Sequence, residues 1–164
     1  MPRRTQRYSK IGDTMKTIDL SGKWNYKTDI DDSHTIDSVK FENNNFNLPG
    51  STCDNQIGKK TEYFDKISKE AVRAPRERYE YIAPLWLQKT VNIPNDTYGK
   101  TVRLFMERVN IASELWIDGV KTDRQIIELS TPHIYNLTGK ITPGEHTFMA
   151  WSDSAAYSFH QQHA

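Results

Sequence analysis

Cys53 is the strongest candidate nucleophile in this sequence, and it is the only cysteine in the chain. A catalytic cysteine needs a neighbouring base that takes the proton from its thiol. His34, His133 and His146 could supply that base, but no spacing in the sequence links one of them to Cys53. The favoured interpretation is therefore a small, buried or partly buried thiol. A single cysteine also excludes a disulfide within the chain.

Carboxylate side chains are plentiful, but both glycoside hydrolysis and calcium binding need them in a particular arrangement. Cleavage of a glycosidic bond requires two carboxylates at a defined separation. Glu107 and Glu114, in neighbouring predicted strands, do not stand out from ordinary surface acids, so we favour a structural role for both. Asp29, Asp31 and Asp32 lack the glycine-containing ligand pattern of a calcium loop, and we interpret this segment as a solvated turn.

The sequence contains none of the common catalytic or nucleotide-binding motifs. Gly-x-Ser-x-Gly, Gly-x-Gly-x-x-Gly, a P-loop and His-Glu-x-x-His are all missing. His160 and His163 could bind a metal, but no further ligand residues lie near them in the sequence. We therefore expect no cofactor and no metal, and an independent enzyme is the least favoured class of function.

The remaining pattern with a possible function is a set of aromatic side chains interleaved with polar ones. This combination is typical of sugar-binding sites. Aromatic planes cover the apolar C–H faces of a sugar ring, and Asp, Asn, Gln, Arg and His bind its hydroxyl edges. Packing in a core or sheet is the alternative for each aromatic residue, and we favour it for Trp24 and Trp86. The aromatic candidates and their polar neighbours are Tyr79, Tyr81 and Trp86 beside Arg76 and Arg78, and Trp116 beside Asp118.

Length and composition limit the classes of protein to which this chain can belong. Its 164 residues are the size of one domain, and an aromatic content of 11% argues against disorder. The net charge of +1 excludes a strongly basic nucleic-acid binder, so we expect no nucleic-acid partner. No apolar run approaches the roughly 20 residues of a membrane span, and we expect no membrane partner. The chain is also too short for a (β/α)₈ barrel, which takes about 250 residues.

Strand patterns dominate the second half of the chain and must position most of these side chains. Apolar and polar residues alternate there, and Asp118-Gly119 predicts a type I′ turn within a hairpin over residues 115–122. Short strands with Gly, Pro and Asn turns favour an all-β fold, a β-sandwich or jelly roll. The strands that we expect lie within residues 19–29, 41–48, 85–93, 101–109, 112–118 and 146–151.

A long polar stretch over residues 50–84 separates the two groups of strands. Residues 61–72 have weak helical spacing, so this excursion could hold a short helix. A loop this long inside a compact domain is usually functional or a packed excursion. We expect one domain over residues 17–153, with disordered or frayed tails at residues 1–16 and 154–164. The N-terminal segment lacks the apolar region of a signal peptide.

Seven short motifs follow one another over most of the chain. They are IDLSGKW (18–24), NLPGS (47–51), LWLQKTVNIP (85–94), GKTVRLFME (99–107), ELWIDG (114–119), LSTPHIYNLT (129–138) and PGEHT (143–147). In order and spacing they resemble the N-terminal sugar-binding domain of glycoside hydrolase family 2, which includes β-galactosidases, β-glucuronidases and β-mannosidases. The resemblance implies a jelly-roll β-sandwich of the galactose-binding-like type.

The resemblance also implies where sugar contacts would lie. In this family the domain precedes an immunoglobulin-like domain and a catalytic barrel that carries two catalytic glutamates. Nothing in this chain matches those glutamates, so no catalytic residue is expected. The family's first domain can contribute a loop to the sugar pocket. The matching loop follows Pro49-Gly50, which makes Asp54 and Asn55 the main sugar-binding candidates, with Tyr81 and His133 beside them. Turn formation is the alternative for Asp54 and Asn55.

Two hypotheses of function remain open on this sequence. The first is a non-catalytic carbohydrate-binding domain of a β-glycosidase parent, with a β-glycoside or oligosaccharide as its partner. The second is a structural domain that docks on a catalytic barrel or on another copy of itself and binds no sugar alone.

Overall fold

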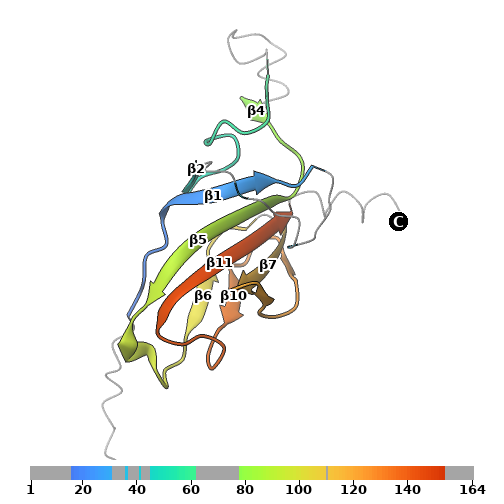
Figure 1. Ribbon diagram of the computed structural model, residues 1–164. Coiled ribbons are helices and arrows are strands. Elements are labelled where there is room, and N and C mark those ends of the chain that lie inside the picture. Colours follow the sequence, from blue (N-terminus) through green and yellow to red (C-terminus); the bar gives the residue numbers. More distant parts are fainter. Residues whose placement is uncertain are drawn as a thin grey trace, which may run out of the picture.

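The structure is a computed structural model that describes residues 16–30, 36, 41, 45–61, 78–109 and 111–153. Nearly all regular structure in these residues is strand, and η3 (Asn95–Thr97) is a short 3₁₀ turn (Figure 1). The all-β prediction is therefore confirmed. Residues 62–77, which hold most of the helix expected over 61–72, lie outside the described residues, as do 1–15 and 154–164 of the two expected tails. No helix in the described residues is long and apolar enough to span a membrane.

A mixed-length antiparallel sheet forms the larger layer of the fold. Its strand order is β2–β1–β5–β11–β7–β8, and β9 pairs with the free part of β7. The centre is the long pairing of β5 with β11, which runs from Gly144 opposite Ile93 to Ser152 opposite Leu85. The strands are β1 (Gly22–Thr28), β2 (Asn45–Leu48), β5 (Leu85–Ile93), β7 (Ile111–Ile117), β8 (Val120–Lys121), β9 (Ile126–Glu128) and β11 (Gly144–Asp153).

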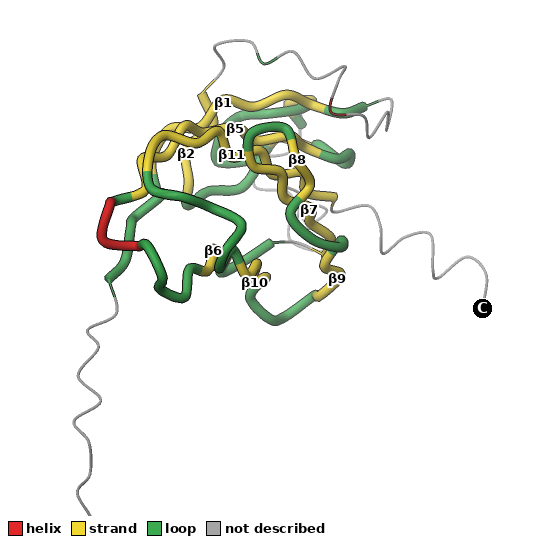
Figure 2. Tube along the Cα trace, turned by 60° about the horizontal axis from the view of Figure 1, so that its bottom comes forward, coloured by secondary structure: helices red, strands yellow, loops and turns green. Residues whose placement is uncertain are grey.

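A second antiparallel layer consists of β6 (Arg103–Met106) and β10 (His133–Asn136). Figure 2 shows these two strands apart from β1, β5 and β11. Burying apolar area between two sheets stabilises both layers, at about 25 cal/mol per Å² removed from water. The main core cluster between the layers comprises Val91, Ile93, Leu115, Ile117, Tyr135, Leu137 and Phe148, with Leu104 and Met106 of β6 packed against it.

The hairpin predicted at Asp118-Gly119 is confirmed. Ile117 of β7 pairs with Val120 of β8, which leaves a loop of two residues. Asp118 has φ +52° and Gly119 has φ +81°, as a type I′ turn requires at both central positions. The Asp118 carboxylate also accepts a hydrogen bond from Thr147 N at 2.8 Å, which ties the turn to β11.

Strand β7 is buried on both of its faces, so the sheet has a second core on its far side. This far-side cluster comprises Trp86, Ala112, Trp116, Met149 and Trp151. Glu114 is 4% exposed on the same face, and its carboxylate forms an ion pair with Lys121 at 2.7 Å.

The prediction of a solvated turn is wrong for Asp29, which is 6% exposed and accepts a hydrogen bond from Trp86 Nε1 at 3.1 Å. Asp31 and Asp32 lie outside the described residues.

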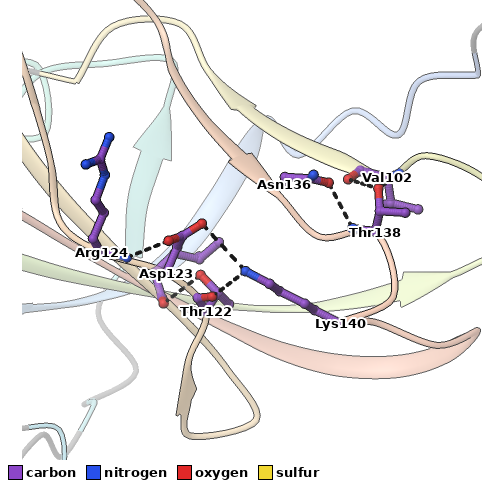
Figure 3. Close-up of polar contacts among 8 residues, drawn as sticks. Val102, Thr122, Asp123, Arg124, Asn136, Thr138 and Lys140 are labelled. Atoms are coloured by element: carbon purple, nitrogen blue, oxygen red, sulfur yellow. Dashed lines mark hydrogen bonds and ion pairs between the residues drawn. The ribbon is translucent and has the colours of Figure 1, made fainter.

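The segment after β10 is held by side-chain bonds within itself, to the residue before β6 and to the end of β8. Asn136 Oδ1 accepts from Thr138 N at 3.1 Å, and Thr138 Oγ1 accepts from Val102 N at 3.0 Å, just before β6 (Figure 3). Lys140 then reaches the end of β8, where its Nζ donates to Thr122 O at 2.6 Å and pairs with the Asp123 carboxylate at 3.5 Å. This segment therefore links the two layers.

Candidate functional site

The loop of residues 51–58 joins β2 to β3 (Lys59–Lys60) and holds two of the four predicted site residues. It follows a cis peptide bond between Leu48 and Pro49. Backbone hydrogen bonds fold it into successive turns, such as the bond from Ile57 N to Thr52 O at 2.9 Å. Ile57 is 5% exposed and packs in the cluster that contains Trp24. The loop is therefore anchored to the core at its far end.

Asp54 lies on the exposed side of this loop. Its Oδ2 accepts hydrogen bonds from Ser51 N and Ser51 Oγ, both at 2.8 Å, and Asp54 N donates back to Ser51 Oγ at 3.1 Å. The bonds from Ser51, the backbone N–H first, hold the pKa of Asp54 below its usual range, so the side chain is a carboxylate at neutral pH. In the described part of the chain Oδ1 has no hydrogen-bond partner, and it can accept from a ligand.

Asn55 ties the loop to β2 with its whole amide group. Its Oδ1 accepts from Asn47 N at 2.7 Å, and its Nδ2 donates to Asn47 O at 3.2 Å and to Ser51 O at 2.9 Å. A Cβ atom on Gly50 would lie 2.7 Å from Asn47 O and 3.1 Å from Asn55 Nδ2, so only glycine fits there. Both amide hydrogens of Asn55 are thus used within the chain, which favours the turn-forming alternative for this residue.

Tyr81 lies beside the same loop. A Cβ atom on Gly58 (φ +101°) would lie only 2.3 Å from Glu80 O and 2.8 Å from Tyr81 Cβ, so the loop meets the end of β4 (Tyr79–Glu80) at close range. The Tyr81 hydroxyl donates to Pro84 O at 2.7 Å, and burial raises the pKa of Tyr81 to about 12. Three of the four predicted site residues thus lie on or beside this loop, with Tyr81 at its Gly58 end, but the Tyr81 hydroxyl is bonded within the chain.

His133 lies elsewhere, inside the core. It is fully buried on β10, and Ser113 of β7 is 2.6 Å from its Nδ1. Strands β1, β5 and β11 separate β7 from β2, which precedes the 51–58 loop. The other ring nitrogen, Nε2, lies 3.0 Å from Glu128 O, which can only accept, so Nε2 carries a hydrogen. Because both nitrogens are used within the core, His133 is not brought into the loop site.

The pair of Ser113 and His133 does not form a catalytic dyad for an external substrate. Ser113 is fully buried, and its hydroxyl also lies 2.8 Å from the hydroxyl of Tyr135, which donates to Ser113 O at 2.8 Å. Burial raises the pKa of Tyr135 to about 12. These three side chains form a hydrogen-bonded network between the two layers, and its role is structural.

The aromatic candidates divide by burial. Trp86 and Trp116 are 1% and 7% exposed and their ring centroids are 4.9 Å apart, so they belong to the far-side cluster. Tyr79 is half-buried beside the loop, and its hydroxyl donates to Gln56 Oε1 at 3.4 Å. Packing therefore explains both tryptophans, and Tyr79 remains at the edge of the loop site.

Two exposed cations beside the loop were not singled out by the sequence. Lys59 and Lys60 form β3, which pairs with β4, and both are exposed immediately after Gly58. Gly58 is the sequence feature that could have predicted the position of these lysines, because its lack of a side chain allows the 51–58 loop to approach β4 closely. The loop offers the Asp54 carboxylate and the Gln56 amide, and Lys59 and Lys60 add one ammonium group on each face of β3, a set suited to hydroxyl and carboxylate groups of a ligand. The described residues contain no group of three metal-ligating side chains.

Another lysine, Lys89, explains why two of the sequence motifs occur together. Its Nζ donates to Leu20 O at 3.1 Å and to Ser21 O at 2.9 Å, and it lies 5.5 Å from the ring centroid of Trp24. Trp24 Nε1 also donates to Leu20 O at 2.8 Å. The motif at 18–24 and the motif at 85–94 therefore hold each other in place, and their role is to fix β1 against β5.

Comparison with known proteins relates this fold to large glycosidases. No family model and no curated protein matches the sequence. Among solved structures, a β-glucuronidase from Faecalibacterium prausnitzii matches 83% of this chain with a TM-score of 0.59 and 20% identity. Matches to β-glucuronidases from Dictyoglomus thermophilum (TM-score 0.55, 17% identity) and Ruminococcus gnavus (TM-score 0.59, 13% identity) each cover 82% of it.

The match covers only a small part of each of those enzymes. This chain spans 20% of the Faecalibacterium and Ruminococcus proteins and 19% of the Dictyoglomus protein. At these identities the likeness concerns the fold. The chain therefore shares the fold of a segment that makes up about one fifth of each of these β-glucuronidases.

Proposed function

We propose that this chain is the non-catalytic, sugar-binding-type domain of a family 2 β-glycosidase, with a jelly-roll fold of the galactose-binding-like type. The observation that carries the proposal is the fold match, which covers four fifths of this chain and one fifth of each β-glucuronidase. The ordered motifs over residues 18–151 support the same assignment. The parent would hydrolyse β-glycosidic bonds, and its further domains would be partners of this one.

The contribution of this domain to carbohydrate binding is the 51–58 loop. Asp54 is exposed and its Oδ1 has no partner among the described residues, and a carboxylate oxygen is a strong acceptor for a sugar hydroxyl. Lys59 and Lys60 are exposed next to the loop on opposite faces of β3, and whichever of them faces the ligand would favour an acidic sugar such as a glucuronide. Asn55 and Tyr81 hold the loop in shape and do not reach the ligand.

A titration of the ¹⁵N-labelled chain with methyl β-glucuronide and methyl β-galactoside, followed by NMR, tests sugar binding. We expect saturable shifts at residues 51–60 and 79–81, larger for the glucuronide. Asp54→Asn keeps an acceptor for Ser51 but removes the charge, and should weaken binding about tenfold. Glu145→Gln, an exposed change on β11, is the matched control and should leave binding unchanged. Unchanged spectra at millimolar sugar would contradict sugar binding.

A structural domain that binds no sugar alone is the second candidate. The observation that favours it is that Asn55, Tyr81 and His133 all use their polar groups within the chain. In that case the sugar titration gives no shifts, and the chain alone gives no turnover of a chromogenic β-glucuronide. Turnover by the chain alone would contradict both candidates.

A further inference from the structure

The outward face of the β6–β10 layer carries an apolar pair where strand alternation favours polar residues. Alternate residues of β6 pack against the core, and the intervening Phe105 points to the other face. Phe105 lies directly opposite Ile134 of β10, and the two side chains are 57% and 48% exposed. An exposed aromatic and β-branched pair on a sheet face is a common feature of protein contact surfaces.

Two charges of opposite sign flank Phe105 in the sequence, one at the start of β6 and one directly after its end. Arg103 lies two residues before Phe105 and Glu107 two residues after it, and all three are exposed. Arg103 and Phe105 share the outward face of β6, and the exposed Glu107, at the bend that directly follows the strand, extends this row, which reads cation, aromatic ring, anion. Neither Arg103 nor Glu107 forms an ion pair with any residue that the structure describes. The flanking charges are therefore available to another molecule.

This row is complementary to itself. When two copies meet through this face, a two-fold axis can lie in the plane between them, perpendicular to β6 and level with Phe105. The rotation reverses the strand direction, so Arg103 of each copy comes to lie over Glu107 of the other, and Phe105 meets Phe105. A symmetric contact repeats each interaction twice, and both unpaired charges gain a partner.

We propose that the outward face of the β6–β10 layer is a contact between two copies of this chain, centred on Phe105 and Ile134 and bordered by two Arg103–Glu107 ion pairs. A face with one charge of each sign has no preference for a polyanion or a polycation, whereas a second copy satisfies both charges. The apolar centre supplies the driving force and the charges fix the orientation. The contact involves a different surface from the 51–58 loop, so it does not depend on sugar binding.

Sedimentation velocity of the 164-residue chain over a range of concentrations tests this contact. We expect the average mass to rise from the monomer value of 19.1 kDa towards twice that value at high concentration. Arg103→Glu alone, or Glu107→Arg alone, replaces two attractive pairs with two repulsive ones and should weaken association at least about tenfold. The double variant R103E/E107R exchanges the charges and should restore it. Phe105→Ser should abolish association.

The controls separate this contact from misfolding and from other interfaces. Arg124→Glu, an exposed charge reversal outside the face, should leave association unchanged, and circular dichroism should show that each variant is folded. A chain that stays monomeric at every concentration overturns the proposal. So does association that persists in R103E, which would place the contact on another surface, or a double variant that is no better than either single variant.

Discussion

His146 has both of its ring nitrogens against oxygen acceptors. Nδ1 is 2.6 Å from the Asp118 carboxylate, and Nε2 is 2.8 Å from Thr142 O. A neutral imidazole has only one N–H and can satisfy one of these acceptors, whereas the imidazolium satisfies both. The Asp118 hydrogen bond is the main reason that the pKa of His146 is raised above its ordinary value of 6.5. The Thr147 N–H, followed by His146, lowers the pKa of Asp118.

These opposite shifts define the pH range in which the pair stabilises the fold. The contribution of His146 is fully present below the pKa of an unfolded histidine, and it is lost as the pH rises through the raised pKa of the folded state. The contribution of Asp118 is present above the pKa of an unfolded aspartate and is lost as the pH falls through its lowered pKa. The pair therefore contributes most between about pH 4 and pH 6.5.

Replacing Asp118 with Asn should lower the pKa of His146, because the amide keeps an acceptor for Thr147 N but removes the negative charge. NMR titration of the His146 ring protons measures this pKa directly. The variant should also be destabilised by about 1 kcal/mol near pH 6 and by less near pH 9. An unchanged His146 titration in Asp118→Asn would show that the carboxylate does not hold the proton on the ring.

Ser113 should be far more important for stability than its size suggests. Replacing it with Ala leaves His133 Nδ1 buried without its Oγ partner, while the Tyr135 hydroxyl keeps its bond to the backbone carbonyl of residue 113. An unsatisfied buried group costs about 1–3 kcal/mol. Urea unfolding of Ser113→Ala should show a loss in this range. Ser130→Ala, at an exposed position, is the control and should stay within about 0.5 kcal/mol of the parent. Equal stability of the two variants would contradict a stabilising network.

At the scale of elements, the sequence predicted strands better than it predicted which side chains meet. Alternation of apolar and polar residues identified residues 85–93, which are the bounds of β5, and Asp118-Gly119 identified the β7–β8 hairpin. These signals are local, since they depend on neighbouring residues alone. The burial of Asp29 and of His133 depends on contacts with Trp86, 57 residues away, and with Ser113, 20 residues away. No local pattern contains such pairs.

In the candidate site, too, the sequence predicted the position of the loop but not the contacts of its side chains. The position of the loop after Pro49-Gly50 followed from the motif order, and the structure has Asp54 and Asn55 on this loop and Tyr81 beside its Gly58 end. Which of them faces solvent could not be predicted, because it depends on how Asn47 and Ser51 use the hydrogen-bonding groups of Asn55.

Gly58 controls how the 51–58 loop meets β4. Gly58→Ala combines a left-handed backbone (φ +101°) with a Cβ atom 2.3 Å from Glu80 O, so the loop must move. Gly119→Ala is the matched control, because Gly119 also has a positive φ (+81°) but open space around it. Each change should carry a backbone cost of about 1 kcal/mol or more, and only Gly58→Ala should add a steric cost.

Unfolding in urea should therefore show a clearly larger loss for Gly58→Ala than for Gly119→Ala. Amide shifts in NMR spectra should change over residues 51–60 and 79–81 in the first variant and stay local in the second. Equal losses in the two variants would contradict the close approach of the loop to β4.

At the scale of the whole molecule, the core clusters make one connected interior on the inner face of the main sheet. Leu20 and Met106 pack against both the cluster between the layers and the cluster that contains Trp24, Phe46 and Ile57. The far-side cluster shares strands β5, β7 and β11 with them. Elements that share a continuous core lose their packing together.

The chain alone should therefore unfold in one cooperative step. Urea unfolding followed by tryptophan fluorescence, which reports on the buried Trp86 and Trp151, should coincide with unfolding followed by far-ultraviolet circular dichroism. The free energy of unfolding should fall within the range of about 5–15 kcal/mol that is usual for single domains. If the fluorescence transition precedes the loss of strand signal, the far-side cluster opens separately from the inner core.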